Sequence, residues 1–291
     1  MIEVEVCAMK ILAFGEIIFD IFNGNETMGG APLNFCAHAV RAGAQAYLMS
    51  AVGNDAYGIE ARQKIAYYGV DDTYVGTVEG YPTGTCNVQL NEKGEPTYLL
   101  AEDTAYDYIS MPEELPEDLD VFYFGTLALR QEHNRKILQR LLRKKPAQEV
   151  FVDINIRPPF DLFENITMAL KHATILKISE EELPLVVGRI FGGAYTTNTA
   201  IYALIKRYKN LKLILLTRGE DGSVAYDQFD GEVHFCDAVK TQVVSTVGAG
   251  DSFSATFVVN YLRGDKCDEA LRKASEVSAY VVSHSGAIPE D

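Results

Sequence analysis

Short apolar runs recur along this chain, separated by stretches with helical periodicity, and this alternation constrains the fold more than any other feature. Each run ends at Gly, Asn, Ser or Thr, which is typical of buried strands. Strands that alternate with helices predict an α/β fold in which a mainly parallel sheet is covered by helices on both faces. The expected strands are residues 10–15, 46–53, 120–125, 149–155, 173–179 and 211–217, and the clearest helices are 33–43 and 133–144.

Residues 81–108 break this alternation, because a turn-forming EKGEP segment lies there between two strand-like runs. The pattern predicts a β-hairpin, and hairpins do not belong inside a series of parallel βαβ units. We therefore expect a small antiparallel flap over the main sheet. In an open α/β sheet the ligand crevice lies beyond the carboxyl ends of the strands, so such a flap can close over a ligand.

The composition limits the classes of protein to which the chain can belong. A length of 291 residues with 47% hydrophobic residues fits one large α/β domain. The net charge of −15 argues against a general nucleic-acid or anionic-membrane surface, although a local site can still hold a small anion. The five scattered cysteines are expected to be free thiols in a reducing cytoplasm.

The opening segment MIEVEVCAMKILAF contains two glutamates and has no basic leader before its apolar residues. It is interpreted as a first strand rather than a signal peptide. No uninterrupted apolar run is long enough to cross a membrane, which again favours a cytoplasmic location.

The segment STVGAGDSF (245–253) precedes a stretch with helical spacing, residues 253–262. Glycines at a helix N-terminus let unpaired backbone N–H groups approach an anion. Asp251 lies at the positive end of the helix dipole, which favours its charged form by about 0.3–1 kcal/mol. A carboxylate beside such an anion hole can accept a proton from an attacking hydroxyl. Taken alone, the loop also fits a simple helix cap; there is no Walker A loop, and the third glycine of GxGxxG is missing.

A second polar group lies near the N-terminus, in GEIIFD (15–20) and MGGAPLN (28–34). Asp20 follows the first strand, at the place where a ligand crevice is expected, and Asn34 opens the next helix. Their carboxylate and amide groups suit sugar hydroxyls. A turn residue and a helix cap are the simpler alternatives for these two side chains.

Together these segments resemble the ribokinase-like carbohydrate kinases, the PfkB family, and within them the fructokinases. GGAPLNFCAHAVRAG…VGNDAYG looks like the family's N-terminal signature and STVGAGDSF like its C-terminal one. VDINIRPPF, LKISEEEL, LLTRGEDGSVAY and HSGAIP follow in the family's order, so the resemblance covers essentially the whole chain. It implies a single ribokinase-like three-layer domain over 1–291, with a small β lid built from about 16–29 and 74–108. The implied activity is phosphorylation of a sugar hydroxyl with ATP and Mg²⁺.

The resemblance also implies roles for individual residues. Asp251 would be the catalytic base, and Gly248, Ala249 and Gly250 would supply the anion hole. No direct protein ligand for the metal is assigned. The implied ligand contacts are Asp20, Gly30 and Asn34 for the sugar, with Arg157 as an addition, and Thr217, Arg218, Gly219 and Gly222 for the nucleotide. Glu182 matches the glutamate of the family's Asn-x-x-Glu motif, which influences the binding of magnesium and phosphate.

Two positions depart from the family's usual pattern. Ser245 stands where the family motif usually has an aspartate associated with a monovalent-cation site, which argues against activation by potassium. Ser179 stands where Asn-x-x-Glu has its asparagine, although LKISEEEL looks like a common fructokinase form.

The charges of the flap bear on the substrate. A phosphorylated sugar would need a cationic clamp, yet residues 81–108 contain one basic residue, Lys93. A neutral sugar is therefore predicted, and GEIIFD, NIRPP and KISEEE favour D-fructose. Ribose, 2-keto-3-deoxygluconate, a nucleoside, or a non-catalytic sugar-binding role remain alternatives. Bare hairpin edges favour a homodimer that pairs through the lid. The acidic residues of the flap are Glu92, Glu95, Glu102, Asp103 and Asp107.

Overall fold

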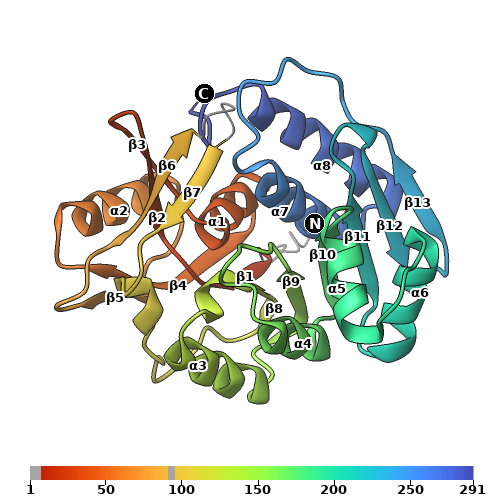
Figure 1. Cartoon of the computed structure of the whole chain (residues 1–291), viewed down its shortest axis with the longest axis horizontal. Helices are drawn as coiled ribbons and strands as arrows, with labels where there is room; N and C mark the ends of the chain where they lie inside the picture. Colours follow the sequence, from red (N-terminus) through yellow and green to blue (C-terminus); the bar gives the residue numbers. More distant parts are fainter. Residues whose placement is uncertain (1–7, 91–95, 291) are drawn as a thin grey trace, which may run out of the picture.

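A nine-stranded sheet forms the centre of the computed structural model, which describes residues 8–90 and 96–290 (Figure 1). The pairs from β11 to β5 are parallel, and β12 and β13 extend one edge in antiparallel fashion. The expected mainly parallel sheet is confirmed. From edge to edge the strands are β13 (Val233–Cys236), β12 (Ser223–Asp227), β11 (Leu213–Thr217), β10 (Ile175–Ser179), β9 (Ala147–Asp153), β8 (Leu119–Gly125), β1 (Lys10–Phe14), β4 (Gln45–Gly53) and β5 (Val75–Val78).

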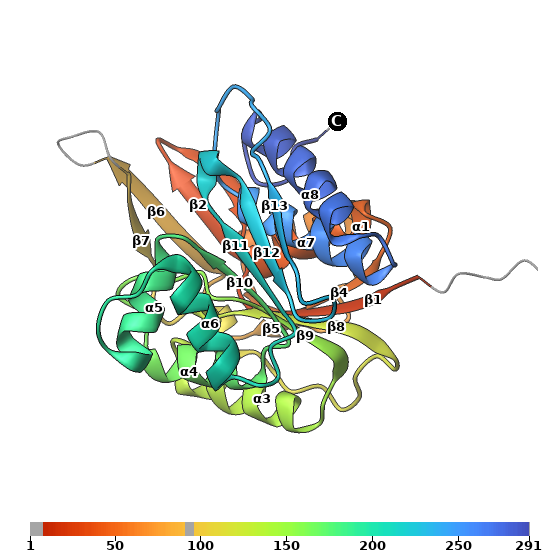
Figure 2. The same cartoon turned by 90° about the vertical axis from the view of Figure 1, so that its right-hand side faces the viewer.

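Helices cover both faces of this sheet, so the fold has three layers (Figure 2). Alternate side chains of one strand enter separate cores: Phe151 packs on one face of β9 and Val152 on the other. Within the described residues, no helix combines the length and hydropathy needed to cross a bilayer. One layer consists of α1 (Ala31–Arg41), α2 (Ala56–Tyr67), α7 (Ala249–Leu262) and α8 (Cys267–Val282), and the other of α3 (Glu132–Arg143), α4 (Phe163–His172), α5 (Glu182–Phe191) and α6 (Thr197–Arg207).

A second, four-stranded sheet projects from the main body in the order β3-β2-β6-β7 (Figure 2). β6 and β7 form the predicted antiparallel hairpin, and residues 91–95, which include Lys93 and all of EKGEP but its proline, lie outside the described residues. The central pair, β2 and β6, is parallel, so this lid is a mixed sheet. Its strands are β2 (Ile18–Phe22), β3 (Asn25–Gly29), β6 (Gly84–Leu90) and β7 (Pro96–Leu100).

The expected lid range of 74–108 is wider than the lid sheet itself. β5 pairs with β4 in the central sheet, because α2 connects the two strands as an ordinary parallel crossover and Val75 is buried in the main core. Beyond β7 the chain leaves the lid through a short 3₁₀ helix, η1 (Ala105–Tyr108).

The other expected elements are found within a few residues of their predicted bounds. The helix expected at 33–43 is α1, which begins earlier because Pro32 suits the first turn of a helix. The strand expected at the N-terminus begins at Lys10, and residues 1–7 lie outside the described part of the chain.

Candidate active site

The glycine loop ends at the N-terminus of α7, as its sequence predicts. Gly248 is the N-cap residue and has a left-handed backbone with φ of 79°. A Cβ atom at this position would lie 2.5 Å from the Cβ of Ala287, so only glycine fits without movement. Asp251 stands in the first turn of the helix, beside backbone N–H groups that have no partner within the helix; that of Ala249 makes a long contact of 3.3 Å with the carbonyl oxygen of Thr246.

The N-terminal polar group meets this loop directly. Asn34 Nδ2 donates a hydrogen bond of 2.8 Å to Asp251 Oδ2, although the two residues are 217 positions apart. Asn34 lies in the first turn of α1. The N-cap residue of this helix is Gly30, whose φ is 113°. A Cβ at Gly30 would lie 2.4 Å from the carbonyl oxygen of Glu16, so this close crossing of two chain segments requires glycine.

The other expected sugar contacts lie on the same side of Asp251. Asp20, on lid strand β2, and Asn34 both lie 3.9 Å from the Cβ position of Gly29. Burial raises the pKa values of both Asp20 and Asp251, and the charge of Arg157, which follows β9 and is exposed, acts in the opposite direction on both. The structure therefore brings Asp20, Gly30, Asn34 and Arg157 together around one carboxylate.

Burial controls the protonation of Asp251. Removal from water raises its pKa to about 6, the hydrogen bond from Asn34 lowers it, and the charge of Asp153 raises it further. The sequence predicted that the helix dipole would favour the charged form. The net direction is the opposite, because desolvation in the crevice outweighs the dipole at this carboxyl. A carboxyl with this pKa is better suited to accept a proton near neutral pH than an ordinary aspartate.

A pocket of about 1390 Å³ opens on the other side of the α7 N-terminus. Three of the expected nucleotide residues line it, Thr217, Gly219 and Gly222, together with Ala249 and Gly250. Apart from Thr246, which belongs to STVGAGDSF, the residues of the opposite wall were not identified from the sequence, because they carry no motif. That wall consists of residues from the 237–246 segment and from α8: Asp237, Ala238, Val239, Lys240, Thr241, Val243, Thr246, Ser275, Ser278, Ala279 and Val282.

Two of the expected nucleotide residues are placed differently. Arg218 is not among the residues that line the pocket, and its guanidinium donates to the carbonyl oxygen of Asp221 at 2.7 Å. Both carboxylate oxygens of Glu182 accept backbone N–H groups, from Ile156 at 2.6 Å and from Ser179 at 2.9 Å. Glu182 therefore holds together the loops after β9 and β10, and this use of its oxygens does not suit a direct metal ligand.

Three buried charged side chains near the site were not singled out from the sequence. Lys177 and Asp153 form an ion pair of 3.1 Å at the carboxyl ends of β10 and β9. Glu16 is buried beside the α1 N-terminus, where desolvation raises its pKa to about 7, and its Oε2 has no hydrogen-bond partner among the described residues. The available signal was a charged residue inside an apolar strand, as in ILKIS and FVDIN, because such charges are rarely buried without a partner.

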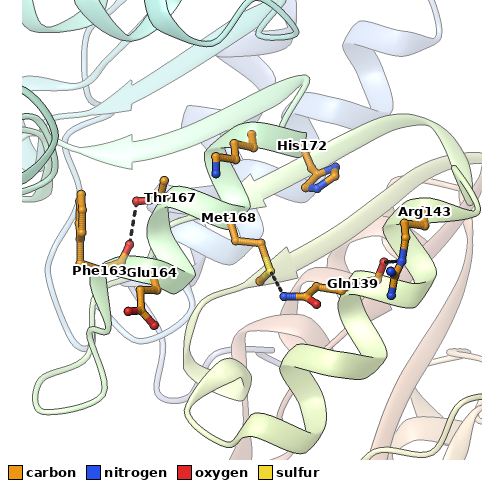
Figure 3. Close-up of a pocket in the computed structure, with 8 residues that line it drawn as sticks. Gln139, Arg143, Phe163, Glu164, Thr167, Met168 and His172 are labelled. Carbon is orange, nitrogen blue, oxygen red and sulfur yellow. Dashed lines mark hydrogen bonds between the residues drawn. The ribbon is translucent and has the colours of Figure 1, made fainter.

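A second hollow, of about 570 Å³, lies between α3 and α4 (Figure 3). It shares no lining residue with the large pocket, and Gln139 Nε2 spans it to Met168 Sδ at 3.6 Å. Its remaining side chains do not converge on a common point in Figure 3. We therefore assign it no role in the site.

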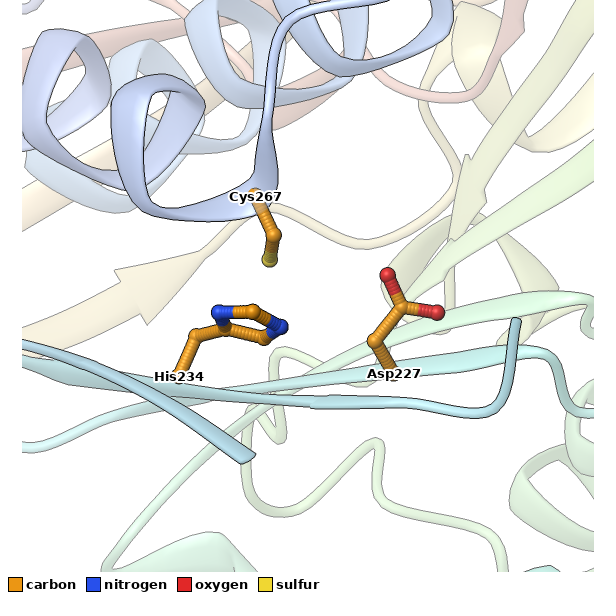
Figure 4. A group of neighbouring side chains, drawn as sticks. All are labelled: Asp227, His234 and Cys267. Atoms are coloured by element: carbon orange, nitrogen blue, oxygen red, sulfur yellow. The ribbon is translucent and has the colours of Figure 1, made fainter. Parts of the chain in front are cut away.

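Asp227, His234 and Cys267 lie together near the start of α8, with one potential ligand atom from each within 4.8 Å of the others (Figure 4). Both nitrogens of His234 already face carboxylates, Asp268 at 2.8 Å and Asp230 at 3.0 Å. Burial, and then the carboxylates of Asp227, Asp230 and Asp268, raise the pKa of Cys267 to about 12. Because existing contacts account for the imidazole and the thiol is held protonated, we assign no metal to this group.

Comparison with known proteins identifies a family and related folds. The model of the pfkB family carbohydrate kinases matches residues 1–291. The chain is 30% identical over 260 residues to a fructokinase from Klebsiella pneumoniae, covering 84% of this chain and 82% of that protein. It is 26% identical over 300 residues to an ATP-dependent 6-phosphofructokinase from Thermoanaerobacterium thermosaccharolyticum, covering 96% and 89%. An uncharacterized sugar kinase from Pyrococcus horikoshii, solved with ATP, superposes with a TM-score of 0.81 at 24% identity, covering 96% and 94%.

Proposed function

This chain belongs to the pfkB family of carbohydrate kinases, and from that premise we propose that it phosphorylates a primary hydroxyl of a neutral sugar, D-fructose, to give fructose 6-phosphate. The contact between Asn34 and Asp251 is the observation that carries the proposal. It sets a carboxylate between a cluster of polar side chains on one side and a large pocket on the other. A base at this junction can reach a sugar hydroxyl and the terminal phosphoryl group of ATP together.

In the proposed reaction the sugar hydroxyl oxygen forms a bond to the γ-phosphorus, and the bond from that phosphorus to the bridging oxygen breaks. The electron pair of the broken bond stays on ADP, and the hydroxyl proton goes to Asp251. The backbone N–H groups of Gly248, Ala249 and Gly250 stabilise the charge on the transferred group. Phosphoryl transfer depends mainly on positioning and electrostatics, so a carboxylate of modest basicity suffices.

MgATP is the proposed cosubstrate and occupies the large pocket. One side of this pocket is lined by Thr217, Gly219 and Gly222. The other side is lined by residues of the 237–246 segment and of α8. In this proposal Glu182 acts on magnesium and phosphate indirectly, by fixing the loops after β9 and β10. Arg218 orders the neighbouring turn through Asp221.

The charge of the lid supports a neutral substrate, because Arg157, the cation on the sugar side, lies outside the lid and its charge acts on the carboxyls of Asp20 and Asp251. The strands of the lid contain no Lys or Arg. Asp107, one of the acidic residues of the 81–108 segment, is buried, and Arg130 pairs with it at 2.6 Å. Arg130 is thereby neutralised and does not offer a phosphate clamp. Asn34 Oδ1 is an acceptor without a partner among the described residues, which supports a ligand rich in hydroxyl groups.

The test of this function is a substrate panel with MgATP, followed by ADP release. We expect turnover with D-fructose to exceed turnover with ribose, 2-keto-3-deoxygluconate, nucleosides and fructose 6-phosphate, and ³¹P NMR to place the ester at carbon 6. Running the panel in sodium and in potassium salts tests Ser245. We expect equal rates, because the aspartate associated with the monovalent-cation site is replaced.

Absence of ADP release with every member of the panel would refute the kinase assignment for this chain and favour a sugar-binding role. Faster turnover of fructose 6-phosphate than of fructose would contradict the neutral-sugar proposal alone. A rate that depends on potassium would remove the argument from Ser245.

We also propose that the protein forms a homodimer through the lid. Phe22, Tyr98 and Leu99 are large apolar side chains left exposed on lid strands, and burying them against a second lid would remove this apolar surface from water. Light scattering at micromolar concentration should give twice the mass of one chain, and a monomer would contradict this proposal. The four described cysteines are unpaired, which fits the cytoplasmic location that we propose.

A further inference from the structure

Lys177 is a buried cation on the face of the sheet that meets the glycine loop. It lies near the carboxyl end of β10, directly across from Asp153 of β9 in the strand register. Its side chain is 9% exposed and that of Asp153 is 1% exposed. Burying two charges is costly, and buried ion pairs often contribute little to stability, so a purely structural reason for this pair is weak.

The amine of Lys177 is directed at the anion hole. A Cβ on Gly250 would lie 3.3 Å from Lys177 Nζ, so the absence of a side chain at Gly250 leaves the amine uncovered. Lys177, Ala249 and Gly250 line the same large pocket. An ammonium group has three N–H donors, and among the described residues Lys177 has one recorded acceptor, Asp153 Oδ1. Two donors therefore remain for a ligand.

The charged groups that act on Lys177 are carboxylates, which repel an anion. The positive charge of Lys177 is therefore what makes this place suitable for an anion. Burial by itself lowers the pKa of Lys177, but the carboxylates of Asp153, Glu182 and Asp251 outweigh it and raise the pKa, so the amine stays charged. Without this cation, the terminal phosphate of ATP would face those carboxylates across a short distance in a poorly solvated crevice, where like charges repel strongly.

We propose that Lys177 is a further catalytic residue of this kinase, which donates two N–H groups to non-bridging oxygens of the phosphoryl group during transfer. The proposal rests on the proposed kinase function. Lys177 keeps its proton throughout, since the hydroxyl proton goes to Asp251 and the leaving electron pair to ADP. The lysine and the backbone N–H groups of the glycine loop stabilise the charge on the same phosphoryl group, because Lys177 Nζ lies close to Gly250. Asp153 is a positioning residue that fixes the direction of the amine.

The test is Lys177→Met compared with Lys212→Met. Lys212 is a matched control, because it also pairs with a carboxylate of β9, Glu149, but at the opposite end of the strand. We expect Lys177→Met to lower kcat by about 10²–10³-fold, the usual cost of removing one preorganised donor to a transition state. KM for the sugar and the affinity for ADP should change little. Lys212→Met should keep the wild-type kcat.

Lys177→Met leaves Asp153 buried without its partner, so a second variant removes both charges. The double variant Asp153→Asn/Lys177→Met should fold, bind ADP and show the same low kcat. Lys177→Ala should regain part of its kcat when ethylamine is added, which loss of packing alone would not produce. A kcat near that of the wild type in the double variant would overturn the role of Lys177. If the wild type itself turned over no sugar, the proposed function would fail instead.

Discussion

Asp251→Asn is expected to lower kcat by about 10²–10⁴-fold, the usual contribution of a general base, which corresponds to about 3–5 kcal/mol in the activation free energy. Asparagine has nearly the same shape, and its carbonyl oxygen can still accept the hydrogen bond from Asn34. It cannot accept the hydroxyl proton. Steady-state kinetics with D-fructose and calorimetry with ADP should therefore show lost turnover with retained nucleotide binding.

The pH dependence gives a second measurement of the same role. The pKa of Asp251 is raised to about 6, and the base must be ionised to act, so activity is expected above this pH. Below it, kcat/KM of the wild type should fall about tenfold per pH unit, and this limb should be missing from the residual activity of Asp251→Asn.

Asp118→Asn is the matched control for the loss of one carboxylate. Asp118 is exposed, and its φ of 56° is a conformation that asparagine tolerates, so kcat should not change. Retention of most of the wild-type kcat in Asp251→Asn would exclude Asp251 as the base. A fall in both variants would point to a nonspecific charge effect.

Gly248→Ala is expected to have the second largest effect in the glycine loop, a fall in kcat of about 10²-fold through displacement of the anion hole. The added methyl group would lie 2.5 Å from the Cβ of Ala287, and φ of 79° is unfavourable for alanine. Either the loop or the segment around Ala287 must move, and the loop carries the backbone N–H groups on which transfer depends. We would measure kcat, ADP affinity and the thermal unfolding midpoint.

Gly264→Ala separates backbone strain from displacement of the site. Gly264 follows the other end of α7, its φ is 105°, and nothing lies within 4 Å of its Cβ position. This variant should lose stability without losing kcat. If Gly248→Ala instead kept its kcat and lost only stability, the loop would be a structural cap and the proposed anion hole would be wrong.

The local features of this protein could be predicted because they are encoded by neighbours in the chain. The apolar runs predicted the strands that the structure shows as β1, β4 and β8–β11. The helix predicted at the end of STVGAGDSF is α7. The boundary of the lid was wrong at β5, because a short strand looks the same whether it joins the lid or the main sheet. Only its pairing with β4 distinguishes the two.

In the site, too, local features could be predicted from the sequence, and contacts between distant segments could not. Asp251, Asn34 and Asp20 were identified by their positions at strand and helix ends, and the structure places them together. Arg218 was expected in the nucleotide pocket, yet its side chain folds onto Asp221. Lys177 lies within the quoted segment LKISEEEL but was given no role, because its partner Asp153 lies on another strand.

The sequence by itself determined the layered parallel sheet, the glycine loop at a helix N-terminus and the carboxylate beside it, since hydrophobic period and backbone freedom are local properties. The tertiary structure alone decided the protonation of Asp251, the contact that joins it to Asn34, and the buried ion pair of Lys177 with Asp153. These depend on desolvation and charge, whose strength is set by groups that are distant in the chain and close only after folding.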